Sequence, residues 1–223
     1  MTRDGAEGAP ALGREHGIRI RQAKAEDVGA ASALLYSAGP EIYDYIFTNA
    51  VQTAQDFIAS EFRSGTGHCG HRAVLVAEQQ GIIVGVACFF DAAEHNRLQR
   101  GSIRNILFSY GFWRCWAVLA RAQHAAPVIS RPGPKEFCLR NFAVATERRG
   151  QGIGTALLRH GIAEAKARGL GRLILDVAET NPRARALYVR LGFKPEQSMR
   201  CRNPRAAAQI PGSTRMVLDL LAC

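Results

Sequence analysis

One segment of this chain is more informative than any other: Arg148-Arg149-Gly150-Gln151-Gly152-Ile153-Gly154-Thr155-Ala156. It lies between a β-rich run and a long amphipathic run, which predicts a turn from a strand into a helix. Its glycines at alternate positions let the backbone turn tightly and leave the main-chain N–H groups open to a ligand. A helix that begins here also has unpaired N–H groups and a positive dipole end. The segment is therefore predicted to bind an anion, and its geometry suits a pyrophosphate.

Two other glycine-loop motifs are excluded by their spacing. A dinucleotide-binding G-x-G-x-x-G/A that begins at Gly150 requires Gly or Ala at Thr155, and one that begins at Gly152 requires it at Leu157. A Walker-type loop requires a lysine, and the segment has none. A glycine-rich turn without any ligand stays open as the alternative.

Beyond this turn the C-terminal part is predicted to alternate between strands and helices. The predicted order is strand, helix, strand, helix, strand, strand, at Phe137–Ala145, Gly152–Arg168, Leu173–Ala178, Asn181–Leu191, Phe193–Arg202 and Met216–Leu220. Glycines follow both helices, as is usual at helix ends.

The first half is predicted to combine antiparallel strands with helices. Its expected elements are a strand at Ile18–Arg21, a helix from Glu26 to Tyr36, helical spacing over Glu41–Phe62, a hairpin of Ala73–Glu78 and Ile82–Phe90 around Gln79–Gly81, and an apolar helix over Ile103–Ala120. Together the two halves predict an α/β (α+β) fold, with a mixed, twisted, mostly antiparallel central sheet and helices on both faces.

Length and composition are those of a single globular domain. The chain has 223 residues, of which 47% are hydrophobic and 22% charged. We expect residues 1–16, which are rich in Gly and Ala, to be a disordered tail, and residues 17–223 to form the domain. No uncharged apolar run approaches the ~20 residues of a membrane helix, and the N-terminus lacks the apolar stretch of a signal peptide. We expect a cytoplasmic protein without a membrane partner.

The cysteines indicate neither a metal site nor a disulfide framework. The six are scattered, without a C-x-x-C pair, and Cys88 and Cys138 lie in apolar runs where they are expected to pack as small core residues. No metal site is predicted.

Positive charge is concentrated in the C-terminal part. The net charge is +10; residues 138–223 hold 15 basic and 6 acidic residues, whereas residues 1–137 hold 14 and 13. Arg outnumbers Lys by 25 to 4, and the planar guanidinium suits phosphate oxygens. Composition alone leaves three interpretations open: a solvated basic surface, a polyphosphate ligand, or a nucleic acid.

Two motifs in this chain resemble those of the GNAT N-acetyltransferase superfamily. Phe142-Ala143-Val144 followed by Arg149-x-x-Gly152-x-Gly154 resembles that family's acetyl-CoA signature, R/Q-x-x-G-x-G/A after a strand. A second block, with Asn181, Ala184, Leu187-Tyr188 and Gly192-Phe193, is similar to the family's N-x-x-A-x-x-L-Y-x-x-x-G-F segment. The resemblance covers roughly residues 18–221.

The resemblance implies a binding site for acetyl-CoA as co-substrate. The strand that ends at Val144 and the strand Leu173–Ala178 would splay apart, with the pyrophosphate on the N–H groups of Arg149–Thr155 and the pantetheine beside Phe142, Ala143 and Val144. Asn181 would also bind the cofactor, and its alternative role is the N-cap of a helix that begins at Pro182. Arg148, Arg149 and Arg185 are candidates for looser phosphate contacts.

The family's tyrosine corresponds to Tyr188, which would protonate the departing thiolate. A phenol suits this step because its pKa near 10 is close to that of a thiol. The alternative is that Tyr188 only packs on the buried face of its helix.

The general base is left undetermined by the sequence. Many relatives have Glu four residues before the valine, and Arg140 stands there, which cannot accept a proton at neutral pH. An ordered water or a carboxylate from Glu41, Asp44, Asp176 or Glu179 would act instead, or the amine would arrive neutral. Arg140 would bind a substrate carboxylate or form a structural ion pair.

The acceptor amine, of a small molecule or of a protein, is likewise undetermined. The aromatic stretch within residues 103–120 could be a wall over the acceptor site, an ordinary packed helix or a homodimer surface. Two other function classes stay open: a catalytically silent acyl-CoA sensor, and, less favoured, a nucleic-acid-binding protein.

Overall fold

The computed structural model describes residues 17–221, so the expected tail at residues 1–16 lies outside the described residues. Seven strands form one sheet in the order β1-β2-β3-β4-β5-β7-β6. Their bounds are β1 Ile18–Gln22, β2 Leu75–Gln79, β3 Ile82–Phe90, β4 Glu136–Val144, β5 Arg172–Ala178, β6 Lys194–Met199 and β7 Ser213–Asp219. Neighbouring strands are antiparallel except for β4 and β5, which run parallel. The predicted mixed, mostly antiparallel sheet is confirmed.

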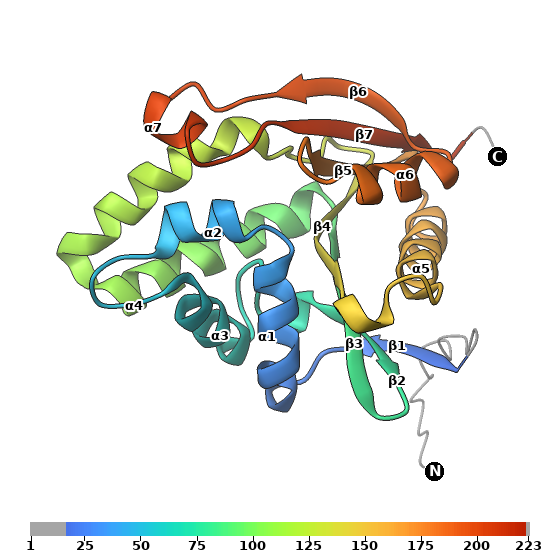
Figure 1. Cartoon of the computed structure of the whole chain (residues 1–223), viewed down its shortest axis with the longest axis horizontal. Coiled ribbons are helices and arrows are strands. Elements are labelled where there is room, and N and C mark those ends of the chain that lie inside the picture. Colours follow the sequence, from blue (N-terminus) through green and yellow to red (C-terminus); the bar gives the residue numbers. More distant parts are fainter. Residues whose placement is uncertain (1–16, 222–223) are drawn as a thin grey trace, which may run out of the picture.

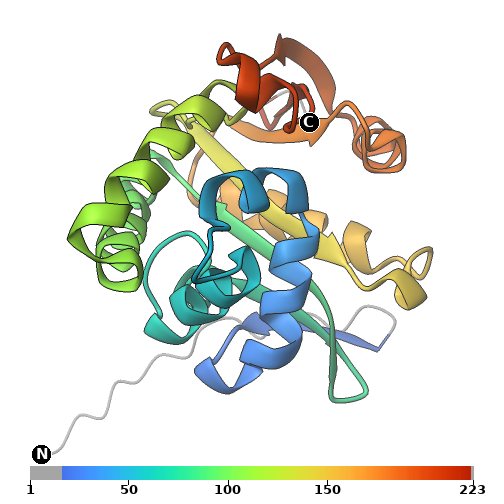
Figure 2. The ribbon, with the colours of Figure 1, turned by 60° about the vertical axis from the view of Figure 1, so that its left-hand side comes forward.

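Helices cover both faces of this sheet, as Figures 1 and 2 show. Their bounds are α1 Val28–Ser37, α2 Pro40–Phe47, α3 Ala54–Ser64, α4 Ala92–Ala125, α5 Ile153–Ala167, α6 Pro182–Arg190 and the short α7 Pro204–Ala207. On one face, α5 and α6 pack over Ala77, Val84 and Leu173. On the other face, α1 and α3 pack over Val76 and Val86.

Alternation along the strands explains how the sheet is buried on both sides. In β1, Ile18 and Ile20 are buried on one face, and Arg21, which points to the other face, pairs with Asp27 and with Glu78 on β2, each at 2.7 Å. The predicted β2–β3 hairpin is present. Its turn residues Gln80 and Gly81 both have positive φ, 53° and 79°, as a tight hairpin turn with the right twist requires.

The structure refines one helical prediction and corrects another. The region Glu41–Phe62 is two helices, α2 and α3, because Thr53 caps α3 by accepting a hydrogen bond from the Asp56 N–H. The apolar helix expected over Ile103–Ala120 is the middle of α4, which is bent at Gly111 (φ 67°, ψ 172°). The bend breaks the expected stripe, so Trp113 is 85% exposed rather than buried.

None of the helices within residues 17–221 is both long and apolar enough to span a membrane.

Candidate functional site

The sheet splits between β4 and β5. The two strands pair only from Glu136 with Arg172 to Leu139 with Leu175. Beyond these pairs β4 continues along β3 to Val144, and β5 continues along β7 to Ala178. Figure 1 shows the two strands diverging from this point. The split expected from the resemblance is therefore present, with Arg140 and Asp176 as the first residues past the last pair.

A bulge in β4 lies just past the point where the split opens. Arg140 pairs with Cys88 and Ala143 with Val86, so Asn141 and Phe142 both oppose Ala87 on β3. Asn141 has a φ of 54°, a left-handed conformation that Asn tolerates better than most residues. Its side chain is fixed from two sides, because its Oδ1 accepts from the Tyr43 hydroxyl at 2.6 Å and its Nδ2 donates to the His68 carbonyl at 3.0 Å.

The glycine-rich turn joins β4 to α5 beside this split. Gly150 and Gly152 have φ values of 85° and 82°, and a Cβ at either would meet no atom within 4 Å. These glycines are required by backbone conformation, and the space over them is open. Within residues 17–221 no acceptor is paired with the backbone N–H groups of residues 150–155. Open N–H groups at the positive end of α5 are what an anion such as a pyrophosphate needs.

Gly154 has a different role from the other two glycines. A Cβ there would lie 3.2 Å from the Phe142 ring, 3.3 Å from Leu187 and 3.7 Å from Val144. Its missing side chain lets the start of α5 approach the end of β4 and α6 closely. The two sequence motifs, one on β4–α5 and one on α6, are thereby brought together.

Tyr188 lies on the buried side of α6, only 5% exposed. Its ring centroid is 6.1 Å from that of Phe142 and 5.9 Å from that of Phe193. Burial raises the pKa of the phenol, so its hydroxyl stays protonated at neutral pH. The hydroxyl has no hydrogen-bond partner within the described chain. Tyr188 therefore both packs in the core and keeps a free proton to donate.

Asn181 caps α6, since its side chain accepts from the Ala184 N–H at 3.0 Å. The predicted N-cap role is confirmed, and Pro182 follows at the first helical position.

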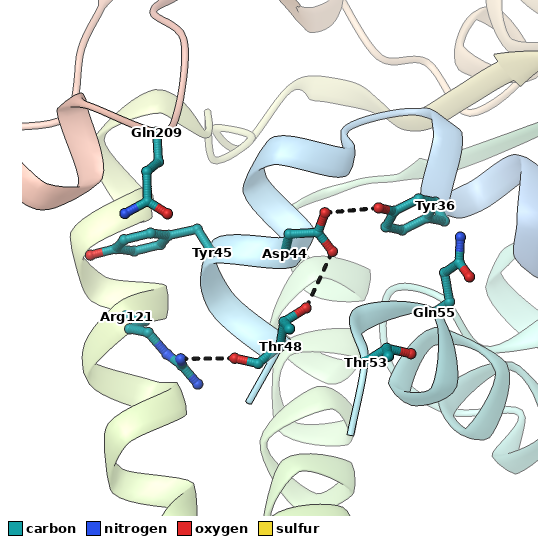
Figure 3. A pocket seen from close by; sticks show the side chains of 8 residues that line it. All are labelled: Tyr36, Asp44, Tyr45, Thr48, Thr53, Gln55, Arg121 and Gln209. Carbon is teal, nitrogen blue, oxygen red and sulfur yellow. Dashed lines mark hydrogen bonds between the residues drawn. The ribbon is translucent and has the colours of Figure 1, made fainter. Parts of the chain in front are cut away.

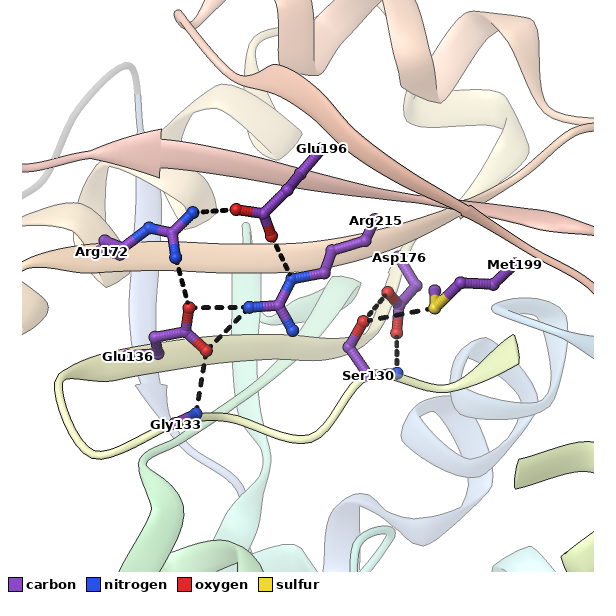
Figure 4. A network of polar contacts seen from close by, with 8 residues as sticks. All are labelled: Ser130, Gly133, Glu136, Arg172, Asp176, Glu196, Met199 and Arg215. Carbon is purple, nitrogen blue, oxygen red and sulfur yellow. Dashed lines mark hydrogen bonds and ion pairs between the residues drawn. The ribbon is translucent and has the colours of Figure 1, made fainter. Parts of the chain in front are cut away.

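Arg140 is held at the split by contacts other than an ion pair, as far as residues 17–221 show. Its Nη2 donates to the Ser130 carbonyl at 2.7 Å, and its guanidinium lies 4.9 Å from the centroid of the Phe90 ring. Ser130 also connects to β5, because its N–H and hydroxyl donate to the Asp176 carboxylate at 2.7 and 2.5 Å (Figure 4). The structural ion pair considered for Arg140 is thus replaced by a link through one serine.

Of the four carboxylates considered as a base, Asp176 stands apart. Burial raises its pKa above the ordinary value, although the bonds from Ser130 and the nearby Arg140 act in the opposite direction. Glu179 is paired with Arg200, and Asp44 accepts from the Tyr36 hydroxyl at 2.8 Å. Glu41 is exposed on α2. Asp176 alone among them is largely buried and adjoins the last β4–β5 pair.

A ring of alternating charges joins the four strands at the closed end of the split (Figure 4). The Glu136 carboxylate on β4 accepts from Arg172 on β5 at 2.9 Å and from Arg215 on β7 at 2.7 and 2.8 Å. Glu196 on β6 accepts from Arg215 at 2.7 Å and also from Arg172. Because β4 and β5 share so few pairs, this ring stabilises the join between the halves of the sheet.

A separate cavity of about 610 Å³ lies beside α2 (Figure 3). It is lined by Tyr36, Asp44, Tyr45, Thr48, Thr53, Gln55, Arg121 and Gln209. No residue of β4, β5 or the glycine turn lines it, so it is distinct from the site at the split.

Some site residues had no clear signal in the sequence. Ser130 directly precedes the Pro/Gly-rich stretch at residues 131–134, and the sequence assigns no role to Ser130, Asn141 or Tyr43. The one usable sign was that Asn tolerates positive φ, which marks it as a candidate bulge residue. No group of three or more His, Cys, Asp or Glu residues placed to hold a metal occurs within residues 17–221.

The chain is an α/β protein whose sheet splits between two diverging strands, and open N–H groups at the start of α5 lie beside the split within residues 17–221. The acetyltransferase (GNAT) family model matches residues 41–193, and the chain belongs to this family.

Individual relatives agree with this assignment. The ribosomal protein bS18-alanine N-acetyltransferase of Escherichia coli strain K12 is 44% identical over 69 residues, 31% of this chain and 47% of that protein. The chain thus spans about half the length of the curated relatives it matches. A crystal structure of an acetyltransferase superposes with a TM-score of 0.64 at 24% identity, over 90% of this chain and 98% of the other. The yncA protein of Salmonella typhimurium, a putative acetyltransferase solved with acetyl-CoA, gives 0.54 at 19% identity, over 92% and 95%. The two superpositions show a shared fold.

Proposed function

We propose that this protein is an acyltransferase that moves the acetyl group of acetyl-CoA directly to a primary amine. The observation that carries the proposal is the set of backbone N–H groups at residues 150–155, at the mouth of the split, which have no acceptor within the part of the chain that the structure describes. An anionic diphosphate satisfies such groups, and a cleft between diverging strands accommodates the extended thioester arm. Family membership and the relative that acetylates an alanine are consistent with this chemistry.

The chain's own residues would bind and orient the co-substrate. Residues Arg149, Gly150, Gln151, Gly152, Ile153, Gly154 and Thr155 would hold the pyrophosphate, and Phe142, Ala143 and Val144 would lie along the pantetheine arm. Asn181 is a further proposed contact. Its Oδ1 already caps α6, which leaves its amide N–H groups to donate.

Two side chains would move the protons. The amine nitrogen attacks the thioester carbon, the C–S bond breaks, and the thiolate takes the proton of the Tyr188 hydroxyl. We propose Asp176 as the acceptor of the amine proton, directly or through a water, since burial makes it a stronger base than an ordinary Asp. Arg140 would bind a carboxylate or phosphate next to the amine, because its charge has no ionic partner within residues 17–221.

A cytoplasmic location is also part of the proposal. Cys69, Cys88, Cys115, Cys138 and Cys201 are all free thiols, as is usual in a reducing compartment.

The test is a pair of measurements on the whole chain. Acetyl-CoA should raise the melting temperature, and mixing it with a panel of amines should release free thiol, fastest for amines that carry a nearby carboxylate. A raised melting temperature without thiol release from any amine would indicate the silent sensor. Binding to DNA or RNA that weakens steeply with salt, without a response to acetyl-CoA, would indicate a nucleic-acid-binding protein.

A further inference from the structure

Large aromatic side chains are exposed at the bend of α4. Phe108 is 81% exposed, Phe112 65%, Trp113 85% and Trp116 62%, and Leu107 beside them is 43% exposed. Phe112 and Trp113 touch each other edge to face, with centroids 5.3 Å apart. Figures 1 and 2 both show the bend as an outer corner of the molecule, away from β5 and α6. These side chains therefore do not form a wall over the acceptor site. An exposed apolar patch of this kind marks a surface that contacts a partner.

A row of arginines leads along the same helix to this corner. Arg97, Arg100 and Arg104 follow one another at spacings of three and four residues, and Leu107 and Phe108 continue the series. These spacings place all five on one stripe of α4, roughly 16 Å long from Arg97 to Phe108. The opposite side of the helix, with His95, Leu98 and Ile106, is buried.

These arginines border a second cavity, and their positive charges are not neutralised by ion pairs within residues 17–221. This cavity of about 450 Å³ is lined by Arg72, Arg97, Arg100 and Arg104 together with Gly65, Thr66, Gly67, Ala73, Leu98 and Gly101, and by no acidic residue. Arg104 donates to the Thr66 hydroxyl at 3.2 Å. The other three guanidinium groups have no hydrogen bond or ion pair within residues 17–221.

Charge restricts what this surface can contact. From His95 to Lys135 the sequence has seven Arg and Lys residues and no Asp or Glu. A second copy that used the same surface would bring like charges together, which disfavours a two-fold dimer here. The partner must therefore be anionic.

The shape of this surface indicates which anionic partner it fits. A nucleic acid strand is bound in a basic groove whose aromatic rings alternate with arginines, so that bases can stack. Here the rings are gathered at an outer corner with Arg114 among them, and Arg97, Arg100 and Arg104 form a row that leads away from this corner along α4. A lipid surface accepts that arrangement, since Trp and Phe enter the interface while arginines stay among the phosphates.

We propose that the outer stripe of α4, Arg97, Arg100, Arg104, Leu107 and Phe108, together with Phe112, Trp113 and Trp116, docks the protein on an anionic phospholipid bilayer. The aromatic corner would insert at the level of the headgroups, and the cavity arginines would bind lipid phosphates. Surface contact of this kind needs no membrane-spanning helix, so this proposal replaces the expectation of no membrane partner, which rested on the lack of such a helix.

The chain carries its own reporter for this contact, because its two tryptophans, Trp113 and Trp116, both lie on the corner. Intrinsic fluorescence is recorded as vesicles are added. Mixed phosphatidylcholine–phosphatidylglycerol vesicles should shift the emission to the blue and protect it from iodide, and pure phosphatidylcholine vesicles should do neither. Arg100→Gln with Arg104→Gln should weaken partitioning about 25-fold, at roughly fivefold for each arginine.

Two further variants distinguish docking through α4 from nonspecific adsorption to vesicles. Phe108→Ser with Phe112→Ser keeps both tryptophans and should abolish the blue shift, with an unchanged melting temperature because both rings are exposed. Arg183→Gln with Arg190→Gln removes two exposed arginines from α6 and should bind vesicles like the parent. The proposal is overturned if this pair weakens binding as much as the α4 pair. It is equally overturned if single-stranded RNA shifts the emission and vesicles do not, or if the only response is concentration-dependent dimerisation.

Discussion

Gly152 and Gly154 are two positions apart, and each position requires glycine for a different physical reason. Gly152 caps α5 with a φ of 82° and open space over its Cα, so a side chain there would be limited by strain and would project into the proposed anion site. Gly154 has an ordinary helical conformation and is limited by contact with Phe142 and Leu187. Gly152 keeps the proposed anion site open, and Gly154 allows α5 to pack closely against α6.

Gly152→Val should keep the fold and lose the response to acetyl-CoA. The left-handed conformation costs about 1–2 kcal/mol for a residue with a Cβ, and the valine blocks the N–H groups. Gly169→Val is the matched control, because Gly169 follows the other end of α5 with a φ of 68° and nothing within 4 Å of a Cβ. Both variants should melt earlier by similar amounts in differential scanning fluorimetry, and only the control should still be stabilised by acetyl-CoA. An equal ligand response in the two would refute the assignment.

Tyr188→Phe should slow turnover by ~10²–10⁴-fold at saturating acetyl-CoA, the usual worth of a positioned proton donor. It removes a hydroxyl that has no partner within residues 17–221, so stability should change little. Because burial raises the Tyr188 pKa, the parent's rate should not fall until pH is well above 10, where the phenol ionises. Tyr110→Phe, which loses a hydroxyl bonded to the Phe47 carbonyl, is the control and should keep its rate. A Tyr188→Phe rate within about threefold of the parent would leave Tyr188 a packing residue.

Asp176→Asn should slow the reaction and leave the fold intact. The asparagine can keep both contacts with Ser130, since its oxygen accepts from the N–H and its amide donates to the hydroxyl. The acid limb of the pH–rate profile, where the parent loses activity as Asp176 is protonated, should disappear. Asp44→Asn is the control, and a larger loss there would move the base to Asp44.

The same residue makes a prediction about stability. A carboxyl whose pKa is raised on folding stabilises the protein below its unfolded pKa, and this contribution is lost as pH rises through the folded value. The free energy of unfolding of Asp176→Asn, relative to the parent, should therefore rise with pH from about 3 to neutrality. Urea titrations across this range measure it, and a flat difference would contradict the raised pKa.

At the level of helices and strands, the sequence predicted those elements whose formation depends on residues close together in the chain. The β2–β3 hairpin, α5 and α6 with its Asn181 cap follow from short-range turn, glycine and capping signals. The bend at Gly111 could not be predicted, because a glycine within an otherwise helical run is compatible with a straight helix. The bulge at Asn141 depends on partners as distant as Tyr43, and the link from Arg140 to Asp176 depends on Ser130. These contacts exist only once the sheet has assembled, which is why the sequence does not decide between an ordered water, four carboxylates and an amine that arrives neutral.

The charge ring across β4, β5, β7 and β6 is expected to act as one element. Glu136→Gln should lower the free energy of unfolding by about 1–3 kcal/mol, because it leaves the largely buried Arg215 with an incomplete set of carboxylate partners. Glu179→Gln is the matched control, since its partner Arg200 is 76% exposed, and should cost less than about 1 kcal/mol. Chemical denaturation of both variants measures the difference, and similar losses would mean that the ring contributes no more than a surface pair.

Over the whole molecule, charge is distributed to suit an anionic co-substrate. Residues 138–223 carry a net +9, and this half contains the glycine turn, α6 and the flanking Arg148, Arg149 and Arg185. The other half is nearly neutral in total, with its arginines on α4 balanced by acids elsewhere. A field of this kind attracts a polyanion to the split before any specific contact forms.

Acetyl-CoA affinity should therefore fall as salt rises from about 0.05 to 0.5 M, over which the Debye length shortens severalfold. Arg148→Gln with Arg149→Gln should flatten that salt dependence, and Arg97→Gln with Arg100→Gln on α4 should leave it unchanged. Isothermal titration calorimetry at several salt concentrations provides the comparison. An affinity independent of salt would place all of the recognition in the uncharged N–H groups.

The short join between β4 and β5 has a mechanical consequence. The sheet consists of two parts joined along a seam of four residue pairs, which is reinforced by the ring of charges and by the packing of α5 on both parts. A load applied between Gly17 and Leu221 reaches that seam, because β1 lies at one edge of the sheet and β7 lies beyond the split. Stretched by optical tweezers, the chain should part first at the seam, releasing β5, β6 and β7 while the hairpin of β2 and β3 still holds.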